Sequence, residues 1–336
     1  MNAFLKFLAI PFSWLYGAIV WIRNQLYNNR IFYSHHVSIP TICVGNLAVG
    51  GTGKTPMVEY LVSELSPHYK VAIVSRGYKR KTHGFVLASP SSTVESIGDE
   101  PMQMHIKFPT VPIAVCKDRV EAIHRLQRQF PDLDVVILDD ALQYRRLKCG
   151  FNILLTAADN LYVDDHYLPL GRLRDSRSEY LRANVIVVTK CPDSLRPIDK
   201  RILDNRLKLP TYQHLYFSRV QYPDIAWQGN PLIVAGVAHP QYFIEYVRRQ
   251  SPDAEVMLYN DHHKYTKADM ELIEQNAQYY GSVLTTEKDY TRLREYTFSD
   301  SLQRKLVVVP IRVEISEPDL LLRQLTTYIN ENRRHV

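Results

Sequence analysis

The stretch that most constrains this 336-residue chain is a glycine-rich loop between an apolar run and an amphipathic segment. The run at 39–44 predicts a short buried strand, and residues 56–65 place apolar side chains at helical spacing. The loop that joins them reads Val44-Gly45-Asn46-Leu47-Ala48-Val49-Gly50-Gly51-Thr52-Gly53-Lys54-Thr55. A strand, a glycine loop, Lys-Thr and a helix, in that order, are typical of a phosphate-binding P-loop. A glycine-rich turn that binds nothing is the alternative, but Gly-Lys-Thr in this setting is more specific than glycines alone.

The residue types of this loop suit the phosphates of a nucleotide. Glycines let successive backbone N–H groups curl around an anion, and the following helix points its positive end at the same anion. Lys54 is expected to reach the outer phosphates and Thr55 to ligate Mg²⁺. The usual pattern has glycine where this chain has Ala48, but two later glycines supply the flexibility. The predicted nucleotide-binding residues are Ala48, Val49, Gly50, Gly51, Thr52, Gly53, Lys54 and Thr55.

Composition narrows the class of protein further. A hydrophobic content of 46% supports folded cores, and the length favours two domains. The net charge of +6 suits acidic lipid, nucleotide or nucleic acid, but no run of five like charges and no nucleic-acid motif occurs, so no nucleic-acid partner is expected. Four widely spaced cysteines without a Cys-x-x-Cys pair argue against a metal cluster or a disulfide framework, and fit a reducing cytosolic compartment.

The N-terminal segment predicts contact with a membrane surface. Residues 1–37 contain no Asp or Glu, and residues 7–22 are mostly apolar and rich in aromatic side chains, with Lys6 and Arg23 on either side. A signal peptide would need a small-residue cleavage site, and none is evident. A spanning helix needs ~20 apolar residues, whereas this run is shorter and contains Pro11. We therefore expect an interfacial helix lying in the membrane surface, with an ordinary core helix as the alternative.

After the loop, strand-like apolar runs alternate with helical segments, which predicts a mainly parallel sheet with helices on both faces. The P-loop NTPase-type α/β fold is therefore expected, followed by a second, smaller α/β unit. Between Tyr78 and Pro101 the alternation gives way to a basic, Ser-rich loop. The predicted domains are an N-terminal membrane-interface helix at 1–30, a P-loop domain at 31–211, a β-type linker at 212–231 and a second α/β domain with a C-terminal helix at 232–336.

Three further sites carry polar side chains with possible chemistry. An apolar strand at 135–138 ends in Asp139-Asp140, and an acid at such a position in P-loop proteins holds Mg²⁺ directly or through water. Asp99-Glu100 closes the irregular loop, and His262 follows a strand at its presumed C-terminal end, where sites in open α/β sheets collect. Two solvated acids at a strand end are the alternative for Asp139-Asp140. Taken alone, Asp99-Glu100 fits a surface turn and His262 an ordinary loop residue.

Seven short motifs together resemble one known family. They are Gly45–Pro56, Ser75–Tyr78, Gly98–Pro101, Asp139–Gln143, Val188–Pro192, Asp261–His263 and Thr286–Asp289. The combination is similar to that of the tetraacyldisaccharide 4′-kinases, which phosphorylate a lipid A precursor. The resemblance extends from the N-terminal helix to about Ser316.

The resemblance implies a function and a set of site residues. ATP would bind the P-loop, with Mg²⁺ near Thr55, Glu100 and Asp139, and Lys54 would act in catalysis. Asp99 and His262 would form the pair that activates the sugar 4′-hydroxyl. The partners it implies are a lipid A disaccharide precursor and the cytoplasmic face of the inner membrane, with no obligate protein partner. The residues expected to bind the acceptor are Arg76, Asp140, Gln143 and Arg174.

Two other functions start from the same P-loop. A GTPase or metallochaperone-type switch would carry Asn/Thr-Lys-x-Asp for guanine, but here Pro192 follows Thr189-Lys190-Cys191 and Asp193 comes one place late, which argues against GTP. A non-enzymatic nucleotide sensor at the membrane would bind ATP and the bilayer but phosphorylate nothing. A product assay separates it from a kinase.

Overall fold

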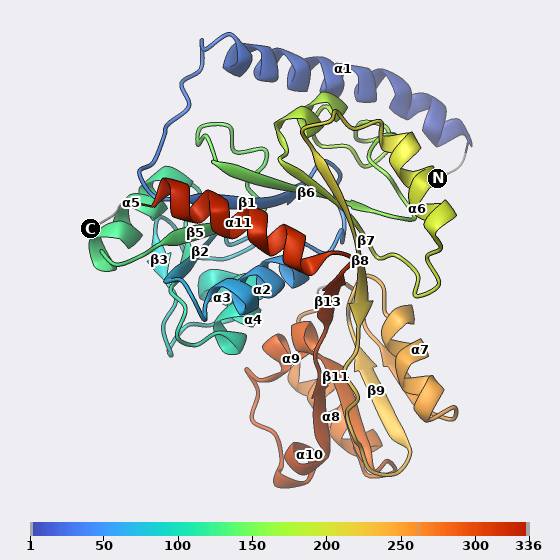
Figure 1. Ribbon diagram of the computed structural model, residues 1–336. Coiled ribbons are helices and arrows are strands. Elements are labelled where there is room, and N and C mark those ends of the chain that lie inside the picture. The colour runs from blue at the N-terminus through green and yellow to red at the C-terminus, as the bar shows by residue number, and fades with distance from the viewer. Residues whose placement is uncertain (1–2, 262, 334–336) are drawn as a thin grey trace.

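The computed structural model describes residues 3–261 and 263–333, which form two sheets (Figure 1). The larger sheet has nine strands in the order β13-β8-β7-β6-β1-β5-β2-β4-β3. Strand β1 (Thr41–Asn46), which leads into the P-loop, pairs in parallel with β5 (Val135–Asp139) and β6 (Phe151–Ala157). All three strands are buried along their whole length, which explains why they appear in the sequence as continuous apolar runs.

The remaining strands of the large sheet are parallel except at its two edges. The parallel strands are β2 (Val71–Ser75), β4 (Ile113–Val115), β7 (Val185–Thr189) and β8 (His214–Gln221). The antiparallel edge strands are β3 (Val86–Leu87) and β13 (Arg312–Ile315).

Helices cover both faces of this sheet, as expected. One face packs against α2 (Lys54–Leu65), α4 (Asp99–Lys107) and α11 (Pro318–Asn332). The other face packs against α5 (Arg119–Gln129) and α6 (Pro197–Leu207). The predicted P-loop α/β fold is therefore confirmed. A short 3₁₀ helix, η1 (Arg177–Arg182), precedes β7.

The smaller unit is a second parallel sheet in the order β10-β9-β11-β12. Its strands are β9 (Pro231–Ala235), β10 (Glu255–Leu258), β11 (Ser282–Thr286) and β12 (Leu306–Val309). Helix α7 (Gln241–Gln250) packs on one face. The other face carries α8 (Lys267–Ala277), α9 (Glu287–Leu293) and α10 (Asp300–Lys305).

The path between the units differs from the expected domain boundaries. Strand β8, expected in a linker at 212–231, lies in the large sheet, where it pairs with β7 and β13. Pro310 ends the apolar run of β12, and the chain then returns to the large sheet as β13. Helix α11, expected in the second domain, buries its apolar stripe in the large core. The small unit therefore comprises residues 222–311 and is inserted in the sequence between β8 and β13, which are neighbours in the large sheet.

The irregular loop expected at 78–101 also contains more structure than the sequence indicated. Helix α3 (Val94–Ile97) ends at Gly98, whose φ of 97° lets α4 begin at the next residue. Asp99 and Glu100 therefore lie in the first turn of a helix, where negative charge is favoured, and not at the end of a loop. Pro101 is tolerated there because the first turn needs no backbone donor.

A partly buried ionic cluster connects the two units. Lys107, near the end of α4, places its Nζ 2.7 Å from Glu59 of the P-loop helix and 2.9 Å from Glu287 of α9. Burial raises the pKa of Glu59, and the positive charge of Lys107 opposes this effect. Removing one partner from such a cluster leaves an uncompensated buried charge, so the cluster fixes how three helices meet.

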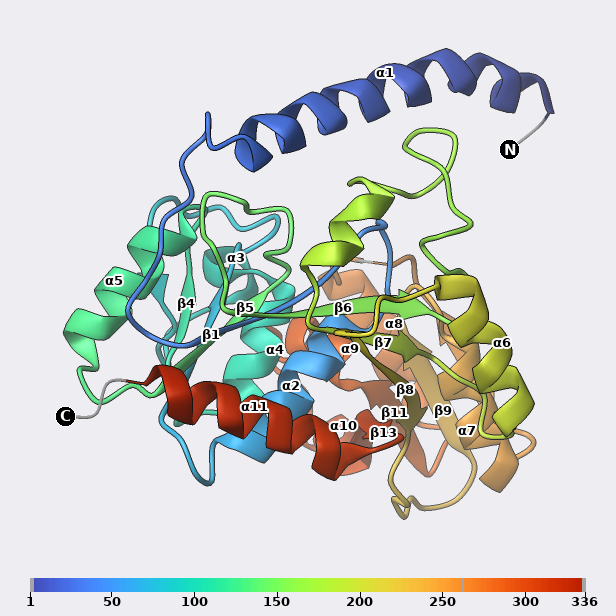
Figure 2. The ribbon, with the colours of Figure 1, turned by 45° about the horizontal axis from the view of Figure 1, so that its top comes forward.

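Helix α1 (Ala3–Asn28) lies apart from the sheet layers, along one side of the large unit (Figure 2). One stripe faces the body, where Ser13 donates to the carbonyl of Tyr167 (2.8 Å) and Arg23 pairs with Asp175 (3.0 Å). The other side is apolar and exposed, and Trp14 is 77% exposed. Within the described ranges, no helix combines the length and hydropathy needed to cross a bilayer.

Candidate active site

The conformation of the P-loop depends on two glycines and on hydrogen bonds from the ends of two strands. Gly50 (φ 113°) and Gly53 (φ 85°) adopt backbone conformations that disfavour other residues. Asn46 Nδ2 donates to Thr52 Oγ1 (2.7 Å), and Thr189 Oγ1, at the end of β7, donates to the Thr52 carbonyl (2.9 Å). The first turn of α2 leaves backbone N–H groups without intrahelical partners. The loop and helix therefore form an anion cradle at the centre of the sheet.

Asp139 ends β5 directly beside the strand that leads into the P-loop. It is buried; its Oδ2 accepts a hydrogen bond from Ser75 Oγ (2.9 Å), while Oδ1 has no hydrogen-bond partner among the described residues. Burial, reinforced by the charges of Glu100 and Asp140, raises the pKa of Asp139 to about 7. An orphaned carboxylate oxygen close to other acids fits a hard divalent cation such as Mg²⁺.

Asp140 connects the P-loop lysine to the expected acceptor residues. Its Oδ2 accepts from Arg174 Nη1 (2.9 Å) and lies 4.0 Å from Lys54 Nζ. Burial alone would raise the pKa of Asp140, but the hydrogen bond from Arg174 and the charge of Lys54 hold it below its usual value. Arg174 also donates to Asn46, and Gln143 Nε2 donates to the Asn46 carbonyl (2.9 Å). Three of the four residues expected to bind the acceptor thus gather beside the P-loop.

The other predicted residues lie around this centre or outside the described residues. Arg76 is exposed just after β2, and Glu100 is close enough for its charge to act on Asp139. Asp99, at the start of α4, has a side chain that is 22% exposed and faces Arg292 of the small unit. His262 lies outside the described residues.

Lys190 and His239 also lie near the P-loop, although no site role was predicted for either residue. Lys190 Nζ and His239 Cδ2 each lie 3.9 Å from the position that a Cβ on Gly51 would take. The charge of Lys190 lowers the pKa of His239, which favours a neutral imidazole. Lys190 follows the C-terminal end of β7, and this position is the signal that could have marked it. His239 reaches the loop from the small unit, a relationship that no local pattern contains.

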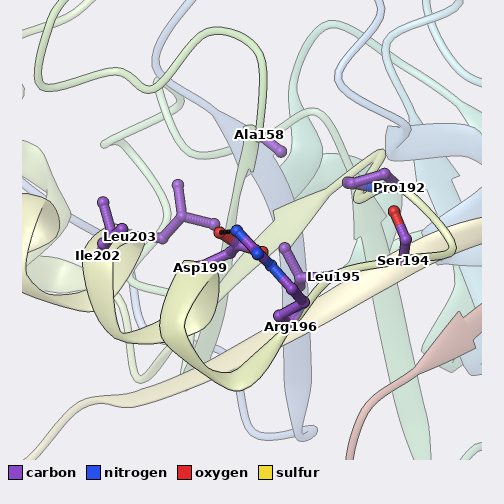
Figure 3. Close-up of a pocket in the computed structure, with 8 residues that line it drawn as sticks. All are labelled: Ala158, Pro192, Ser194, Leu195, Arg196, Asp199, Ile202 and Leu203. Atoms are coloured by element: carbon purple, nitrogen blue, oxygen red, sulfur yellow. Dashed lines mark hydrogen bonds and ion pairs between the residues drawn. The ribbon is translucent and has the colours of Figure 1, made fainter.

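A surface hollow of about 630 Å³ lies outside the P-loop site, where β6 and β7 end and along α6 (Figure 3). Arg196 and Asp199 form an ion pair there at 3.0 Å. None of the predicted site residues lines it. The lining residues are Ala158, Pro192, Ser194, Leu195, Arg196, Asp199, Ile202 and Leu203.

A P-loop at the end of a central parallel strand, with a buried acid ending the next strand, defines the P-loop class of nucleotide-binding proteins. The family model described as tetraacyldisaccharide-1-P 4′-kinase matches residues 5–330, and the chain belongs to this family. The family resemblance seen in the sequence is therefore confirmed, and the switch and sensor alternatives are not favoured.

Named relatives agree with this assignment. The tetraacyldisaccharide 4′-kinase of Flavobacterium johnsoniae is 42% identical over 346 residues, covering 99% of each chain. That of Bacteroides thetaiotaomicron is 39% identical over 355 residues, covering 97% of this chain and 93% of the relative. A crystal structure described as the "apo" form of LpxK from Aquifex aeolicus in complex with ATP matches with a TM-score of 0.77 and 25% identity, covering 97% of this chain and 99% of that one.

Proposed function

We propose that this protein transfers the γ-phosphoryl group of ATP to the 4′-hydroxyl of a tetraacyldisaccharide 1-phosphate precursor of lipid A. Family membership supports the reaction class and the acceptor. The observation that carries the proposal is the position of Lys54, between the P-loop cradle and Asp140, which binds the expected acceptor residue Arg174. Nucleotide and acceptor would therefore meet at one lysine.

Catalysis of this transfer depends mainly on position and charge. The backbone N–H groups of the loop and of the first turn of α2 would hold the phosphates, and Lys54 would stabilise the charge on the transferred group. Thr55, Glu100 and Asp139 would hold Mg²⁺, which when bound neutralises charge on the phosphate oxygens. Among residues 3–261 and 263–333, no three His, Cys, Asp or Glu side chains are grouped to hold a metal. Mg²⁺ commonly takes one or two carboxylates and completes its coordination with phosphate and water.

The acceptor hydroxyl would be activated by Asp99 together with His262. A carboxylate with an ordinary pKa of ~4 is a weak base at neutral pH, so it needs a partner to share the proton. Asp99 begins α4 of the large unit, whereas position 262 belongs to the sequence of the small unit. Catalysis would therefore need both units around the bound nucleotide, which would also exclude water.

The direct test is the mass of the acceptor. Purified protein, ATP and Mg²⁺ incubated with tetraacyldisaccharide 1-phosphate should add the mass of one phosphate to the lipid. ATP binding without this mass change would favour the sensor instead. Faster transfer from GTP than from ATP would favour the switch-type alternative.

A double-mutant cycle tests the proposed Asp99–His262 pair. Asp99→Ala and His262→Ala should each lower kcat while ATP affinity stays nearly intact, because neither residue belongs to the P-loop. The double variant should cost little more than the worse single variant, since the two act as one device. Fully multiplicative losses would indicate independent roles, and a large loss of ATP affinity in His262→Ala would assign that residue to the nucleotide.

We further propose that α1 binds the cytoplasmic face of the inner membrane through its exposed apolar side. Tyr16 on the opposite side donates to the carbonyl of Arg174 (3.1 Å). The proposed membrane helix therefore rests on the segment that carries an expected acceptor residue. This arrangement would allow the acyl chains to stay in the bilayer while the sugar reaches the P-loop.

Removing the apolar side of α1 should release the protein from membranes. Deletion of residues 1–22, or the milder double variant Phe12→Asp/Trp14→Asp, should reduce co-sedimentation with anionic vesicles, because the binding strength scales with the apolar area that is buried in the membrane. Tyr279→Asp is the matched control, since Tyr279 is an aromatic residue 84% exposed on the small unit. Unchanged co-sedimentation of both α1 variants would contradict the proposal.

A further inference from the structure

Arg292 of α9 is a buried arginine at the boundary between the two units. Its side chain is 6% exposed. Nη2 donates to Asp289 Oδ1 (2.8 Å) and to the carbonyl of Gly236 (3.3 Å), and Nη1 donates to the carbonyl of His263 (3.3 Å). All three acceptors belong to the small unit, so that unit fixes the orientation of the guanidinium.

Asp289 is the anchor of this arrangement. The residue is fully buried, and both carboxylate oxygens are occupied. Oδ2 accepts from the Gly236 backbone N–H (3.0 Å) and from Thr286 Oγ1 (2.7 Å), while Oδ1 accepts from Tyr265 Oη (3.2 Å) as well as from Arg292. A carboxylate held from four directions leaves the arginine little freedom to rotate.

The third nitrogen of the Arg292 guanidinium, Nε, faces the large unit. Nε is buried and has no hydrogen-bond partner among the described residues, and it lies 4.0 Å from Asp99 Oδ2 on α4. A buried donor on a charged group is costly to leave unpaired, so such a group calls for an explanation. The separation exceeds the length of a charge-assisted hydrogen bond, ~2.8 Å, by only about 1 Å.

We propose that Arg292 is a positioning residue for phosphoryl transfer. Its Nε–H bonds to one oxygen of Asp99 when substrates are bound, and this leaves the other oxygen facing the acceptor hydroxyl. Its Nη1 binds the carbonyl of His263, so the guanidinium stays fixed to the small unit while Nε faces Asp99. One guanidinium thus links Asp99 of the large unit to the segment of the small unit that carries His263. This inference rests on the proposed function of Asp99.

The competing explanation is purely structural: Arg292 would only neutralise the buried charge of Asp289. Arg292→Lys separates the two explanations, because a single ammonium group can pair with Asp289 but has no second nitrogen to reach Asp99. The Lys variant keeps the charge, so its melting temperature should stay within a few degrees of wild type. A structural role predicts little effect on turnover in a variant that remains folded.

The experiment is a kinetic cycle with ATP, Mg²⁺ and tetraacyldisaccharide 1-phosphate. Arg292→Lys should lower kcat about 10- to 100-fold with the KM for ATP changed by less than about twofold, because the interaction concerns the acceptor side. In an Asp99→Ala background the same substitution should change the residual rate by less than about twofold. Arg294→Lys, at an exposed position that follows α9, is the matched control and should leave both rates unchanged.

Tyr265→Phe is a milder second variant, which removes one hydrogen bond from Asp289 and leaves Arg292 in place. Tyr265→Phe should lower kcat less than Arg292→Lys does. In the Asp99→Ala background it should have no further effect on the rate. Equal losses with and without Asp99, or unchanged turnover in Arg292→Lys, would overturn the role of Arg292. Wild-type turnover in Asp99→Ala would instead overturn the proposed role of Asp99, so the two failures are distinguishable.

Discussion

Lys54→Ala should lower kcat by ~10²–10³-fold, the scale expected when a preorganised charge stabiliser is removed from a phosphoryl-transfer site. Lys54 begins α2, its side chain is 14% exposed, and its Nζ lies 4.0 Å from Asp140. The truncated side chain can no longer reach the phosphates. The fold should survive, because Arg174 still pairs with Asp140. Steady-state kinetics at varied ATP, with the melting temperature as a folding check, measure this effect.

Lys267→Ala is the matched control, because Lys267 is an exposed lysine at the first position of another helix, α8, in the small unit. It should leave kcat and the KM for ATP unchanged. Near-normal turnover in a folded Lys54→Ala protein would rule out the P-loop as the site of transfer.

Asp139→Asn should have opposite effects on stability and on activity. The pKa of this carboxyl is about 7 in the folded protein, against ~3.9 in an unfolded chain. As pH rises through this window, the unfolded chain loses the proton first, so the free energy of unfolding falls. Asn removes the buried charge and can still accept from Ser75, so the free energy of unfolding should rise on the order of 2–4 kcal/mol at pH 8. Phosphoryl transfer should fall ~10²-fold or more, because a proposed Mg²⁺ ligand is lost.

Chemical denaturation in EDTA at pH 4 and at pH 8 measures the stability effect, and the gain should nearly vanish at the lower pH. Asp140→Asn is the control of opposite sign, because the folded protein lowers the pKa of Asp140 and so gains stability from its charge. Equal destabilisation by Asp139→Asn at both pH values would contradict a carboxyl whose pKa is raised by burial.

The fold was largely predictable because its signals are local. The P-loop motif specifies a strand, a turn and a helix within a few residues, and the buried parallel strands are continuous apolar runs. Asp139 was also predictable, since an acid at the end of such a strand meets the P-loop edge of the sheet.

The features that escaped prediction depend on contacts between distant segments. Helix α4 starts at a glycine junction that leaves no periodic signal. Strands β8 and β13 are hydrogen-bonded neighbours, although the whole small unit separates them in the sequence. Neither strand alone therefore indicates which sheet it joins. The sequence around Arg292 is that of an ordinary helical arginine, and only the fold brings its guanidinium close to both Asp99 and Asp289.

The path of the chain has one further consequence. Gln221 and Arg312, the last residue of β8 and the first of β13, are directly paired. Cα atoms paired in this way are about 5.5 Å apart or less, a gap that a two-residue hairpin turn closes. Residues 222–311 thus form an insertion between two paired strands. Deleting this insertion would leave every strand of the large sheet intact. The shortened protein would keep the ATP cradle but lack position 262 and Arg292, and would separate nucleotide binding from phosphoryl transfer.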